Sequence, residues 1–472
     1  MRIDRKTLYL FVFIGTVILG FIYLTSPSFP SLYPLGNIAD GPRHFALAQY
    51  IQENGHLVHD SIYELTSSGS GVMDTYPFGM HLNMALLSSM LGVPLIKFIF
   101  PFNAFIVALT AGALYGISVE VLKLDKGIAI CSPFFFLTSL HVMDALTYQN
   151  SYSTIFAGFL ALVFFWVLSD YSKKTDYPKL LFLALLETAM VFSYPFWALI
   201  TLAAFLANYL FFMEFEEKRM HLAILVSAST LLTIYFWWDK FFVLKLRMQE
   251  IGIVPRGIIA TTGKLLILLA VIGFFPYKKD RQTLYTFFLA VVVIPLILFF
   301  SSIFGFRSTS YWYYKTLYFL EYPLVLFACL GLEKIVKYSY HKSASVQKDN
   351  NSIKYYVMLF LLATSVTGIV YLRVSRVEKD RWRSFSVTPE EYEIAKWMNE
   401  NIPTTRILYF DPDPEASERP FIFWILTVSR HSIGEGGDII LLKNINEIPY
   451  SMIVEFKPAY KSDNINLLVR RK

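Results

Sequence analysis

Residues 7–26 read TLYLFVFIGTVILGFIYLTS, a run of twenty residues without a charged side chain. A helix of about 20 apolar residues crosses the roughly 30 Å hydrocarbon core of a bilayer. The preceding residues, MRIDRK, are basic, and no small-residue cleavage site follows the run. This stretch therefore predicts an uncleaved membrane anchor and not a signal peptide.

The composition extends this prediction to the whole chain of 472 residues, which is 55% hydrophobic and only 17% charged. Its mean hydropathy is +0.48. In soluble domains about a quarter of the residues are charged, so the class of soluble globular proteins is excluded and we expect the chain to lie in the lipid bilayer.

The two cysteines lie in apolar runs, without the spacing of a disulfide framework or zinc site. The net charge of +6 comes from Lys and Arg in short loops, which is a topology signal, and we expect no nucleic-acid partner.

Ten further apolar runs are candidate membrane spans, which gives about eleven in total. A break is predicted at Ser193-Tyr194-Pro195, because proline disfavours helical geometry at the preceding residue. Residues 78–95 are predicted to form an external helix on or in the outer leaflet, because a full span there would put the later basic loops outside. The ten runs are residues 98–122, 126–141, 151–169, 180–193, 196–213, 220–237, 261–276, 283–302, 316–332 and 355–372.

This count places the basic loops on the side of the amino terminus, which the positive-inside rule assigns to the cytoplasm.

After residue 372 the chain becomes polar, with a helix expected from Thr388 through Asn399. Strand-like runs follow at residues 406–410, 439–442, 452–456 and 467–469. The predicted fold class is mainly α: a polytopic transmembrane helical bundle (1–372, including a first outer loop, 27–96) and a small extracytoplasmic α/β domain (373–472).

The first outer loop contains DGPRH at residues 40–44, followed by a predicted helix over 45–52 that ends near Gly55. Asp40 has two compatible interpretations. It is suited to cap this helix, with proline in the first turn, or to act as a carboxylate that deprotonates an acceptor hydroxyl or binds a metal ion. His44 lies one turn further along the same face, where a histidine is more often a surface residue than a ligand. The apolar positions of the helix fall on one arc: Phe45, Leu47, Ala48 and Ile51.

Two other outer segments carry candidate site residues. Residues 141–150, HVMDALTYQN, contain Asp144, which would be a second carboxylate for a divalent cation, although interfacial loops are ordinarily polar. Residues 303–315 end in RSTSYWYYK, an aromatic and basic sequence typical of membrane-interface anchoring. Arg307 and Lys315 in this loop would alternatively hold a lipid phosphate. Glu187, in the middle of an apolar run, is either functional or simply protonated or hydrogen-bonded.

The order of these features resembles the GT-C superfamily of polytopic glycosyltransferases, which use polyprenyl-phosphate-linked sugars on the outer face of the membrane. The resemblance rests on four segments that together extend over most of the chain. They are Asp40…His44…Ala48…Ile51…Gly55, YPFGMHL at 76–82, the aromatic basic loop before YFLEYP at 318–323, and EEY…KWMNENIP at 390–403.

The resemblance implies that Asp40 matches the first-loop acid of the family. It implies Asp144 and His44 as acceptor-binding or metal-binding residues, and Lys315 or Arg307 as the cation at the donor phosphate. A metal, if used, would be Mn²⁺ or Mg²⁺, held by Asp40 and Asp144. Gly41 stands where many protein O-mannosyltransferases have Glu, which leaves open whether Asp40 is a base or a metal ligand.

The function implied is transfer of a sugar, with inversion, from a polyprenyl-phosphate donor to a glycan, lipid or protein acceptor. Oligosaccharyltransferase catalytic subunits carry Trp-Trp-Asp-Tyr-Gly in the outer domain, whereas here residues 237–240 read WWDK in a membrane loop, which favours a monosaccharide transferase. Two other classes stay open. One is a transporter or flippase-like protein, with Glu187 as its main midplane candidate. The other is a non-catalytic assembly protein with a GT-C-like fold.

Overall fold

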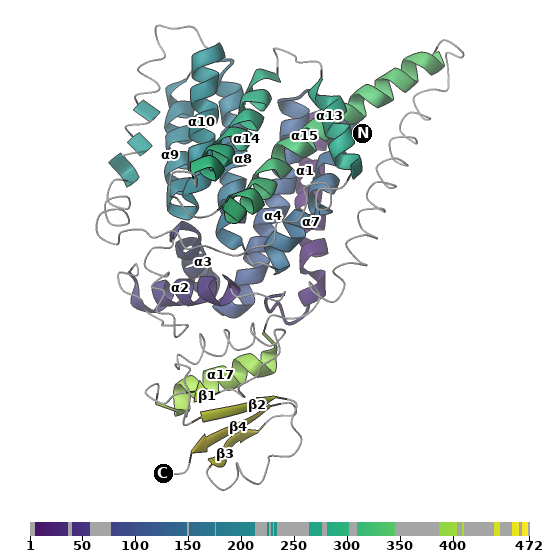
Figure 1. Ribbon diagram of the computed structural model, residues 1–472. Helices are drawn as coiled ribbons and strands as arrows, with labels where there is room; N and C mark the ends of the chain where they lie inside the picture. The colour runs from purple at the N-terminus through teal and green to yellow at the C-terminus, as the bar shows by residue number, and fades with distance from the viewer. Residues whose placement is uncertain are drawn as a thin grey trace. The chain divides into compact units, whose positions relative to one another are not determined.

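Figure 1 shows the chain as a computed structural model. The structure describes residues 5–35, 40–56, 77–148, 151–174, 176–212, 224–225, 228–229, 231–233, 264–275, 281–301, 309–344, 387–403, 408–409, 439–443, 456–461 and 465–470. The predicted span at 355–372 lies outside these residues, as does most of the span at 220–237.

The described chain is mainly α-helical, as predicted. The first half contains α1 (Arg5–Thr25), the 3₁₀ turn η1 (Ser26–Ser28), α2 (Asp40–Asn54), α3 (Gly79–Leu91), α4 (Leu95–Glu120), α5 (Lys126–Ala129), α6 (Cys131–Leu137), α7 (Leu140–Met143), the π-helical turn η2 (Asp144–Tyr148), α8 (Tyr152–Tyr171), α9 (Tyr177–Ser193) and α10 (Pro195–Phe212). The second half contains α13 (Lys264–Phe274), α14 (Gln282–Ser301), α15 (Thr309–Ala344) and α17 (Pro389–Asn401).

Within the described residues, three helices are long and apolar enough to cross a membrane: Thr7–Ser28, Leu95–Glu120 and Tyr152–Tyr171. A fourth is added if Lys126–Leu137 and His141–Thr147, which meet at 51°, form one broken span. Several apolar helices in one chain are typical of a multi-pass membrane protein. The count of about eleven spans stays a prediction.

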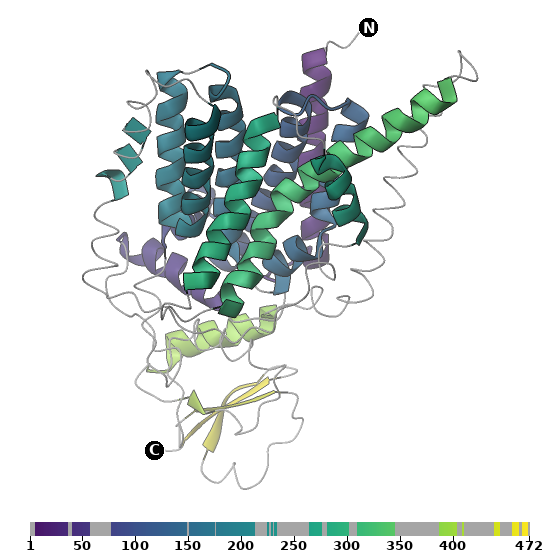
Figure 2. The ribbon, with the colours of Figure 1, turned by 45° about the horizontal axis from the view of Figure 1, so that its top comes forward.

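The break predicted at Ser193-Tyr194-Pro195 is confirmed. Tyr194 has extended geometry (φ −162°, ψ 95°) between α9 and α10, because Pro195 begins the second helix and restricts the residue before it. Figure 2 shows α8, α9, α10 and α14 running alongside one another, with α10 packed against both α9 and α14. A buried hydrogen bond of 3.2 Å from Trp197 Nε1 to the carbonyl of Thr154 also ties α10 to α8.

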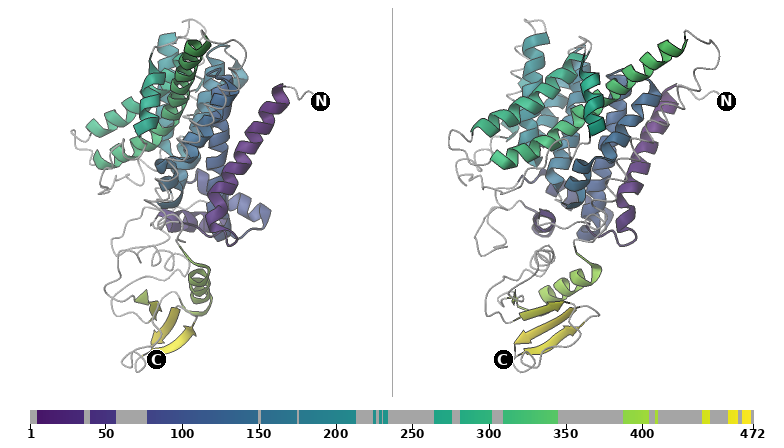
Figure 3. Two further views of the ribbon diagram at one scale, coloured as in Figure 1. Left: turned by 90° about the vertical axis from the view of Figure 1, so that its right-hand side faces the viewer. Right: turned by 45° about the vertical axis from the view of Figure 1, so that its right-hand side comes forward.

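Helix α1 runs antiparallel to α4, as Figure 3 shows. Two aromatic pairs set this direction, because Tyr9 meets Tyr115 at 5.7 Å while Phe21 meets Phe105 at 6.1 Å between ring centroids. Tyr9 also interacts with Glu120, near the end of α4. The anchor predicted over residues 7–26 is therefore a helix packed on the bundle along one side.

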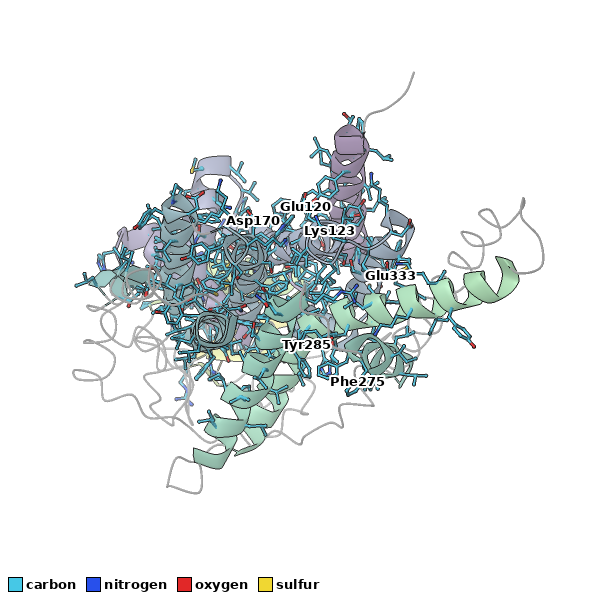
Figure 4. All side chains as sticks on the ribbon, turned by 90° about the horizontal axis from the view of Figure 1, so that it is seen from above. Glu120, Lys123, Asp170, Phe275, Tyr285 and Glu333 are labelled. Atoms are coloured by element: carbon cyan, nitrogen blue, oxygen red, sulfur yellow. The ribbon has the colours of Figure 1, made fainter. Side chains whose placement is uncertain are left out.

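Helices α13 and α15 cross at two glycines. A Cβ atom at Gly273 would collide with the carbonyl oxygen of Phe327, and one at Gly331 would collide with that of Leu269. Lys334 then caps the end of α13, with Nζ donating to the carbonyl oxygens of Ile272 at 2.8 Å and Gly273 at 3.0 Å. A cation stabilises the carboxyl end of a helix. Figure 4 labels Phe275, Tyr285 and Glu333 around this crossing.

Helix ends and a loop that are predicted to share the cytoplasmic side meet at one end of the bundle. Figure 4 shows Glu120, Lys123 and Asp170 grouped there. Asp170 Oδ2 pairs with Lys179 Nζ at 2.7 Å, and Lys123 adds to the positive charge around this carboxylate. The assignment of this end to the cytoplasm stays a prediction.

The predicted outer loop at residues 303–315 is wrong in its second half, which is helical. Residues 303–315 were expected to be a loop, but α15 begins at Thr309 and runs for 36 residues. No proline or glycine occurs between Thr309 and Glu321, so nothing in the backbone chemistry interrupts the helix there. Lys315 is therefore a helical residue.

The chain divides into two compact units. One contains Met1–Leu24, Asn103–Ala145 and Ser153–Lys379, and we call it the helical unit. The other contains Thr25–Phe102, Leu146–Tyr152 and Asp380–Lys472, and we call it the first-loop unit. Most of the first outer loop is grouped with the tail in this division, and the expected domain boundary after residue 372 stays a prediction. Tyr33 packs edge-on against Tyr392 of α17 inside this unit, at 5.8 Å.

The tail contains a helix and a small sheet, close to the predicted elements. Helix α17 begins with a complete capping box, in which Thr388 and Glu391 each accept a backbone N–H of the other. The strands are β1 (Leu408–Tyr409), β2 (Ile439–Lys443), β3 (Phe456–Lys461) and β4 (Ile465–Arg470), in the order β1-β2-β4-β3. Among the described strands, β1 pairs with β2 in parallel and β4 pairs with β2 and β3 antiparallel. The predicted strand at 452–456 overlaps the described residues at Phe456.

Candidate functional site

The candidate site of the first-loop unit lies on α2 and α3, two helices that pack together. The predicted apolar arc of α2 is confirmed, because Phe45, Leu47, Ala48 and Ile51 are all buried. Leu47 and Ile51 form a core with Ala85 of α3. Gly55 ends the α2 segment with a φ of +70°, a conformation that glycine adopts without a steric penalty.

Helix α3 confirms a separate helix within residues 78–95. It ends at Leu91 because Gly92, with φ +64°, turns the chain and donates its N–H to the carbonyl oxygens of Ser88 and Ser89. Gln52 of α2 donates to the Ser89 hydroxyl at 2.9 Å, which adds a polar contact between the two helices. Helices α2 and α3 therefore pack together as a compact pair.

A buried histidine pair joins the amino-terminal turns of these helices. His44 Nδ1 and His81 Nε2 are 2.8 Å apart, and the two side chains are only 1% and 0% exposed. His81 Nδ1 lies 3.1 Å from the carbonyl oxygen of Pro77. The ring of Tyr152 packs on His44 with 5.4 Å between centroids. His44 is therefore a buried residue, not the surface histidine that its position also suggested.

Burial determines the charge of His81. Desolvation lowers its pKa to about 3, with the Pro77 carbonyl opposing that shift only in part. His81 is consequently a neutral imidazole at physiological pH. A neutral imidazole has one N–H and one lone pair, so the neighbours of its two nitrogens decide the tautomer.

The helical unit contains a second candidate site, a cavity of about 20 Å³. This volume is enough for one water molecule. Its lining includes Thr110, His141, Thr154, Trp197, Tyr318 and Glu321. These residues come from α4, α7, α8, α10 and α15, and α6 and η2 also contribute to the lining, so the cavity lies where several helices meet.

Glu321 is the chemically unusual residue of this cavity. Its side chain is 1% exposed, and neither carboxyl oxygen forms a hydrogen bond with a described residue. The Ser139 hydroxyl interacts with the carboxyl group without well-formed hydrogen-bond geometry. Buried polar groups are almost always satisfied, and ionisable groups inside a membrane bundle are usually functional. Glu187 differs, because Thr201 donates a 2.8 Å hydrogen bond to it, as its structural interpretation expects.

The same cavity links two of the predicted site segments. His141 contacts Tyr318 edge-on, with 5.7 Å between ring centroids. Asp144 begins the π-helical turn η2 one turn after His141, and Lys315 precedes Tyr318 by one turn of α15. Asp144 and Lys315 therefore flank a pair of rings in direct contact.

The structure distributes the predicted site residues over both units. Asp40 is the first residue of α2, one turn before His44. Asp144 and Lys315 belong to the helical unit. The side chains of Asp40, Asp144 and Lys315 are outside what the structure describes, and so is all of Arg307. Their roles as base, metal ligand or phosphate ligand stay predictions.

No group of three or more His, Cys, Asp or Glu side chains converges on a point in the described part of the chain. His44 is suited to be one metal ligand. Its Nδ1 lies within hydrogen-bond distance of His81, and the second ring nitrogen of a metal-bound histidine is commonly hydrogen-bonded to another group. The predicted partners Asp40 and Asp144 lie outside the described side chains. A complete set of ligands for Mn²⁺ or Mg²⁺ is therefore not established, and the prediction of Mn²⁺ or Mg²⁺ stays open.

Comparison with solved structures decides the fold. The oligosaccharyltransferase of Archaeoglobus fulgidus in its apo form aligns over 92% of this chain with a TM-score of 0.56 and 11% identity. The arabinofuranosyltransferase AftD from Mycobacteria aligns over 99% of this chain with a TM-score of 0.57 and 13% identity. Both are GT-C membrane glycosyltransferases. The chain has a GT-C fold.

At 11% to 13% identity the likeness shows the fold alone. The chain spans 65% of the length of the archaeal oligosaccharyltransferase and 42% of the length of AftD. The Archaeoglobus fulgidus enzyme has been observed with an inhibitory peptide and a dolichol-phosphate, and separately with Zn and sulfate. No protein-family model matches the sequence. No curated protein matches it either.

Sequence reasoning missed three residues that define these sites: His81, His141 and Glu321. His81 was part of the segment resembling the GT-C family, but its contact with His44 joins positions 37 residues apart. Glu321 carried a detectable signal, since an acid inside an apolar run is costly unless it has a role. His141 carried no signal that separates it from other interfacial histidines.

Proposed function

We propose that this protein is a membrane glycosyltransferase that moves one sugar from a polyprenyl-phosphate donor to a hydroxyl acceptor. The observation that carries the proposal is the GT-C fold, shared over 92% of the chain with an oligosaccharyltransferase and over 99% with an arabinofuranosyltransferase. The proposal places the reaction on the outer face of the membrane, with the amino terminus in the cytoplasm and the tail outside. It identifies the acceptor only as a glycan, lipid or protein.

In the proposed mechanism, Asp40 orients the acceptor hydroxyl and takes its proton as the oxygen attacks the anomeric carbon. The bond between that carbon and the phosphate oxygen breaks on the opposite side, which inverts the anomeric configuration. Lys315 or Arg307 stabilises the negative charge that collects on the departing lipid phosphate. Most of the acceleration then comes from holding donor and acceptor in line.

Asp40 and Asp144 would hold a Mn²⁺ or Mg²⁺ ion if the enzyme uses one, and His44 would be a third donor. A cation there would neutralise phosphate charge. No step of the proposal depends on it, since Lys315 or Arg307 supplies positive charge in its absence.

The test is an assay of the purified full-length protein in lipid nanodiscs with a panel of radiolabelled polyprenyl-phosphate sugars. Release of free sugar, or transfer to a supplied membrane extract, supports a transferase. If every donor stays intact while vesicles containing the protein transport donor across the bilayer, the transporter or flippase alternative is correct. If neither occurs, but loss of the protein disrupts assembly of another enzyme, the non-catalytic alternative is correct.

A further inference from the structure

The buried cavity of the helical unit adjoins a break in a helix. The chain bends by 51° between Lys126–Leu137 and His141–Thr147. Phe136 lines the cavity on one side of the bend, and Val142 lines it on the other. A helix that ends inside a bundle leaves carbonyl oxygens without their intrahelical partners. Broken helices in membrane proteins are tolerated where they line a cavity, and the carbonyl ends of such half-helices coordinate small cations.

Three oxygen-bearing side chains lie at this cavity or at the bend beside it. The Glu321 carboxyl group is buried, and neither of its oxygens forms a well-formed hydrogen bond with a described residue. The Thr110 hydroxyl donates its hydrogen to the carbonyl oxygen of Ile106 at 2.8 Å, so it offers lone pairs to a guest. The Ser139 hydroxyl accepts the backbone N–H of His141 at 3.2 Å and interacts with the Glu321 carboxyl group.

The charge and size of the cavity favour a small monovalent cation as the guest. Among the described residues that line it, none is Lys or Arg, and the indole N–H of Trp197 is donated to the Thr154 carbonyl. A buried carboxylate is strongly destabilised unless a positive charge accompanies it. Glu321 is the one acid among the described lining residues, so it balances a single positive charge. The volume of about 20 Å³ admits a guest about as large as one water molecule.

We propose that this cavity binds one sodium ion, held by the Glu321 carboxylate and by the hydroxyl oxygens of Thr110 and Ser139. Hard cations take oxygen ligands, and the small volume favours sodium over the larger potassium ion. The ion joins α4 and α15 to the bend between α6 and α7. Because Asp144 directly follows α7, the ion also fixes the segment that carries this residue. The proposal rests on the geometry of the helical unit and does not depend on the proposed sugar transfer.

Direct binding of ²²Na⁺ tests the site without using activity. Purified full-length protein is exchanged into sodium-free choline buffer and titrated with ²²Na⁺ at constant ionic strength. The expected result is saturable binding of one ion per chain, which unlabelled sodium displaces and an equal concentration of potassium does not. Glu321→Gln keeps the size of the side chain but removes its charge, and it should lose this binding. No saturable binding in the parent, or unchanged binding in Glu321→Gln, overturns the proposal.

A second variant tests where the ion lies. Thr110→Val removes one proposed oxygen ligand and should weaken sodium binding by roughly twofold to tenfold. Thr188→Val is the matched control, because the Thr188 hydroxyl donates to the carbonyl oxygen of Ala184 at 2.8 Å within α9, which contributes no described residue to the cavity. Equal sodium affinity in Thr110→Val and Thr188→Val would place the ion elsewhere and overturn the assignment.

Thermal unfolding shows that each variant is folded and gives an independent readout. A ligand that binds only the folded chain raises the unfolding temperature as its concentration rises above Kd. The parent should therefore be stabilised by sodium but not by potassium at the same ionic strength. Glu187→Gln should keep this response, because Glu187 is bonded to Thr201 and does not line the cavity.

Glu321→Leu should show no sodium response. In sodium-free buffer it should unfold at a higher temperature than the parent, whose buried carboxylate then has no cation, and sodium should narrow this difference. A parent that sodium does not stabilise, or a Glu321→Leu protein that sodium stabilises as much as the parent, would refute the sodium site. A parent that transfers no sugar would refute the proposed function and leave these measurements intact.

Discussion

The ring of His141 meets the ring of Tyr318 edge-on, with 5.7 Å between their centroids. His141 belongs to α7 and Tyr318 to α15, and the two residues share the lining of the buried cavity with Glu321. Each lies one turn from a residue predicted to act on substrate, Asp144 in one case and Lys315 in the other. The contact therefore joins the two segments of the chain that carry Asp144 and Lys315.

Lys315→Gln should weaken binding of a polyprenyl-phosphate donor by roughly tenfold to a hundredfold, because a charge-assisted contact to phosphate contributes about 1.5 to 3 kcal/mol. Fluorescent donor binding to protein in nanodiscs measures the change. Arg307→Gln should weaken binding less. Lys337→Gln is the matched control, because Lys337 pairs with Glu333 at 2.8 Å, a contact with no proposed role in donor binding. Unchanged affinity in both test variants removes the phosphate assignment.

Glu321→Leu should raise the unfolding temperature while lowering the transfer rate. Replacing a buried carboxyl group that forms no well-formed hydrogen bond with a described residue by an apolar side chain removes a desolvation penalty of about 1 to 3 kcal/mol. Such a trade of stability for activity is typical of functional sites. Scanning fluorimetry and the transfer assay measure the two effects.

Glu333→Leu is the control for Glu321, since Glu333 is also buried but pairs with Lys337 at 2.8 Å and with Arg281 at 3.8 Å. The Glu333→Leu substitution removes the carboxylate that pairs with the buried Arg281 and should therefore lower the unfolding temperature. If Glu321→Leu is destabilised like Glu333→Leu, the acid at 321 is structural.

Gly331→Ala should destabilise the helical unit by about 1 to 3 kcal/mol, because the added methyl group meets backbone atoms of α13 that cannot move aside. Gly15→Ala provides the matched control, since a Cβ atom there has nothing within 4 Å. Thermal unfolding of the two variants in the same detergent tests the crossing of α13 and α15. Equal unfolding temperatures would mean that these helices do not meet at Gly331.

Single-cysteine labelling tests the predicted topology. The predicted topology puts three loop residues outside and four in the cytoplasm, so impermeant maleimide should label only the first set in sealed cells. Labelling of a cysteine at position 279 would overturn the count from the middle of the chain onward. The outer set is Gly69, Gly252 and Asn444, and the cytoplasmic set is Lys173, Lys218, Lys279 and Lys342.

Local signals predicted local structure well. Pro195 located the break after α9, and the apolar arc ending at Gly55 located α2, because both depend on backbone chemistry within a few residues. The sequence did not predict the start of α15, because the aromatic and polar residues from Thr309 to Lys315 are typical of an interfacial loop. The structure shows that these residues are helical.

The candidate sites depended on contacts that sequence order does not reveal. His44 was identified from its spacing to Asp40, but its partner His81 is reached only when α2 and α3 pack together. The cavity at Glu321 forms only when α4, α6, α7, α8, α10 and α15 pack together. The roles of Asp40, Asp144, Lys315 and Arg307 came from resemblance, and they stay predictions because their side chains lie outside the described residues.

The most direct measurement is the rate of sugar transfer by Asp40→Asn protein. Asparagine begins a helix about as well as aspartate, so the fold should be preserved while the charge is lost. The account predicts a rate at least about a hundredfold below the parent, the usual contribution of a general base or metal ligand. Asp125→Asn is the matched control, because Asp125 caps α5 through a 2.9 Å hydrogen bond from Gly127, and it should transfer sugar at the parent rate. Asp40→Asn protein that also transfers sugar at the parent rate would contradict the account.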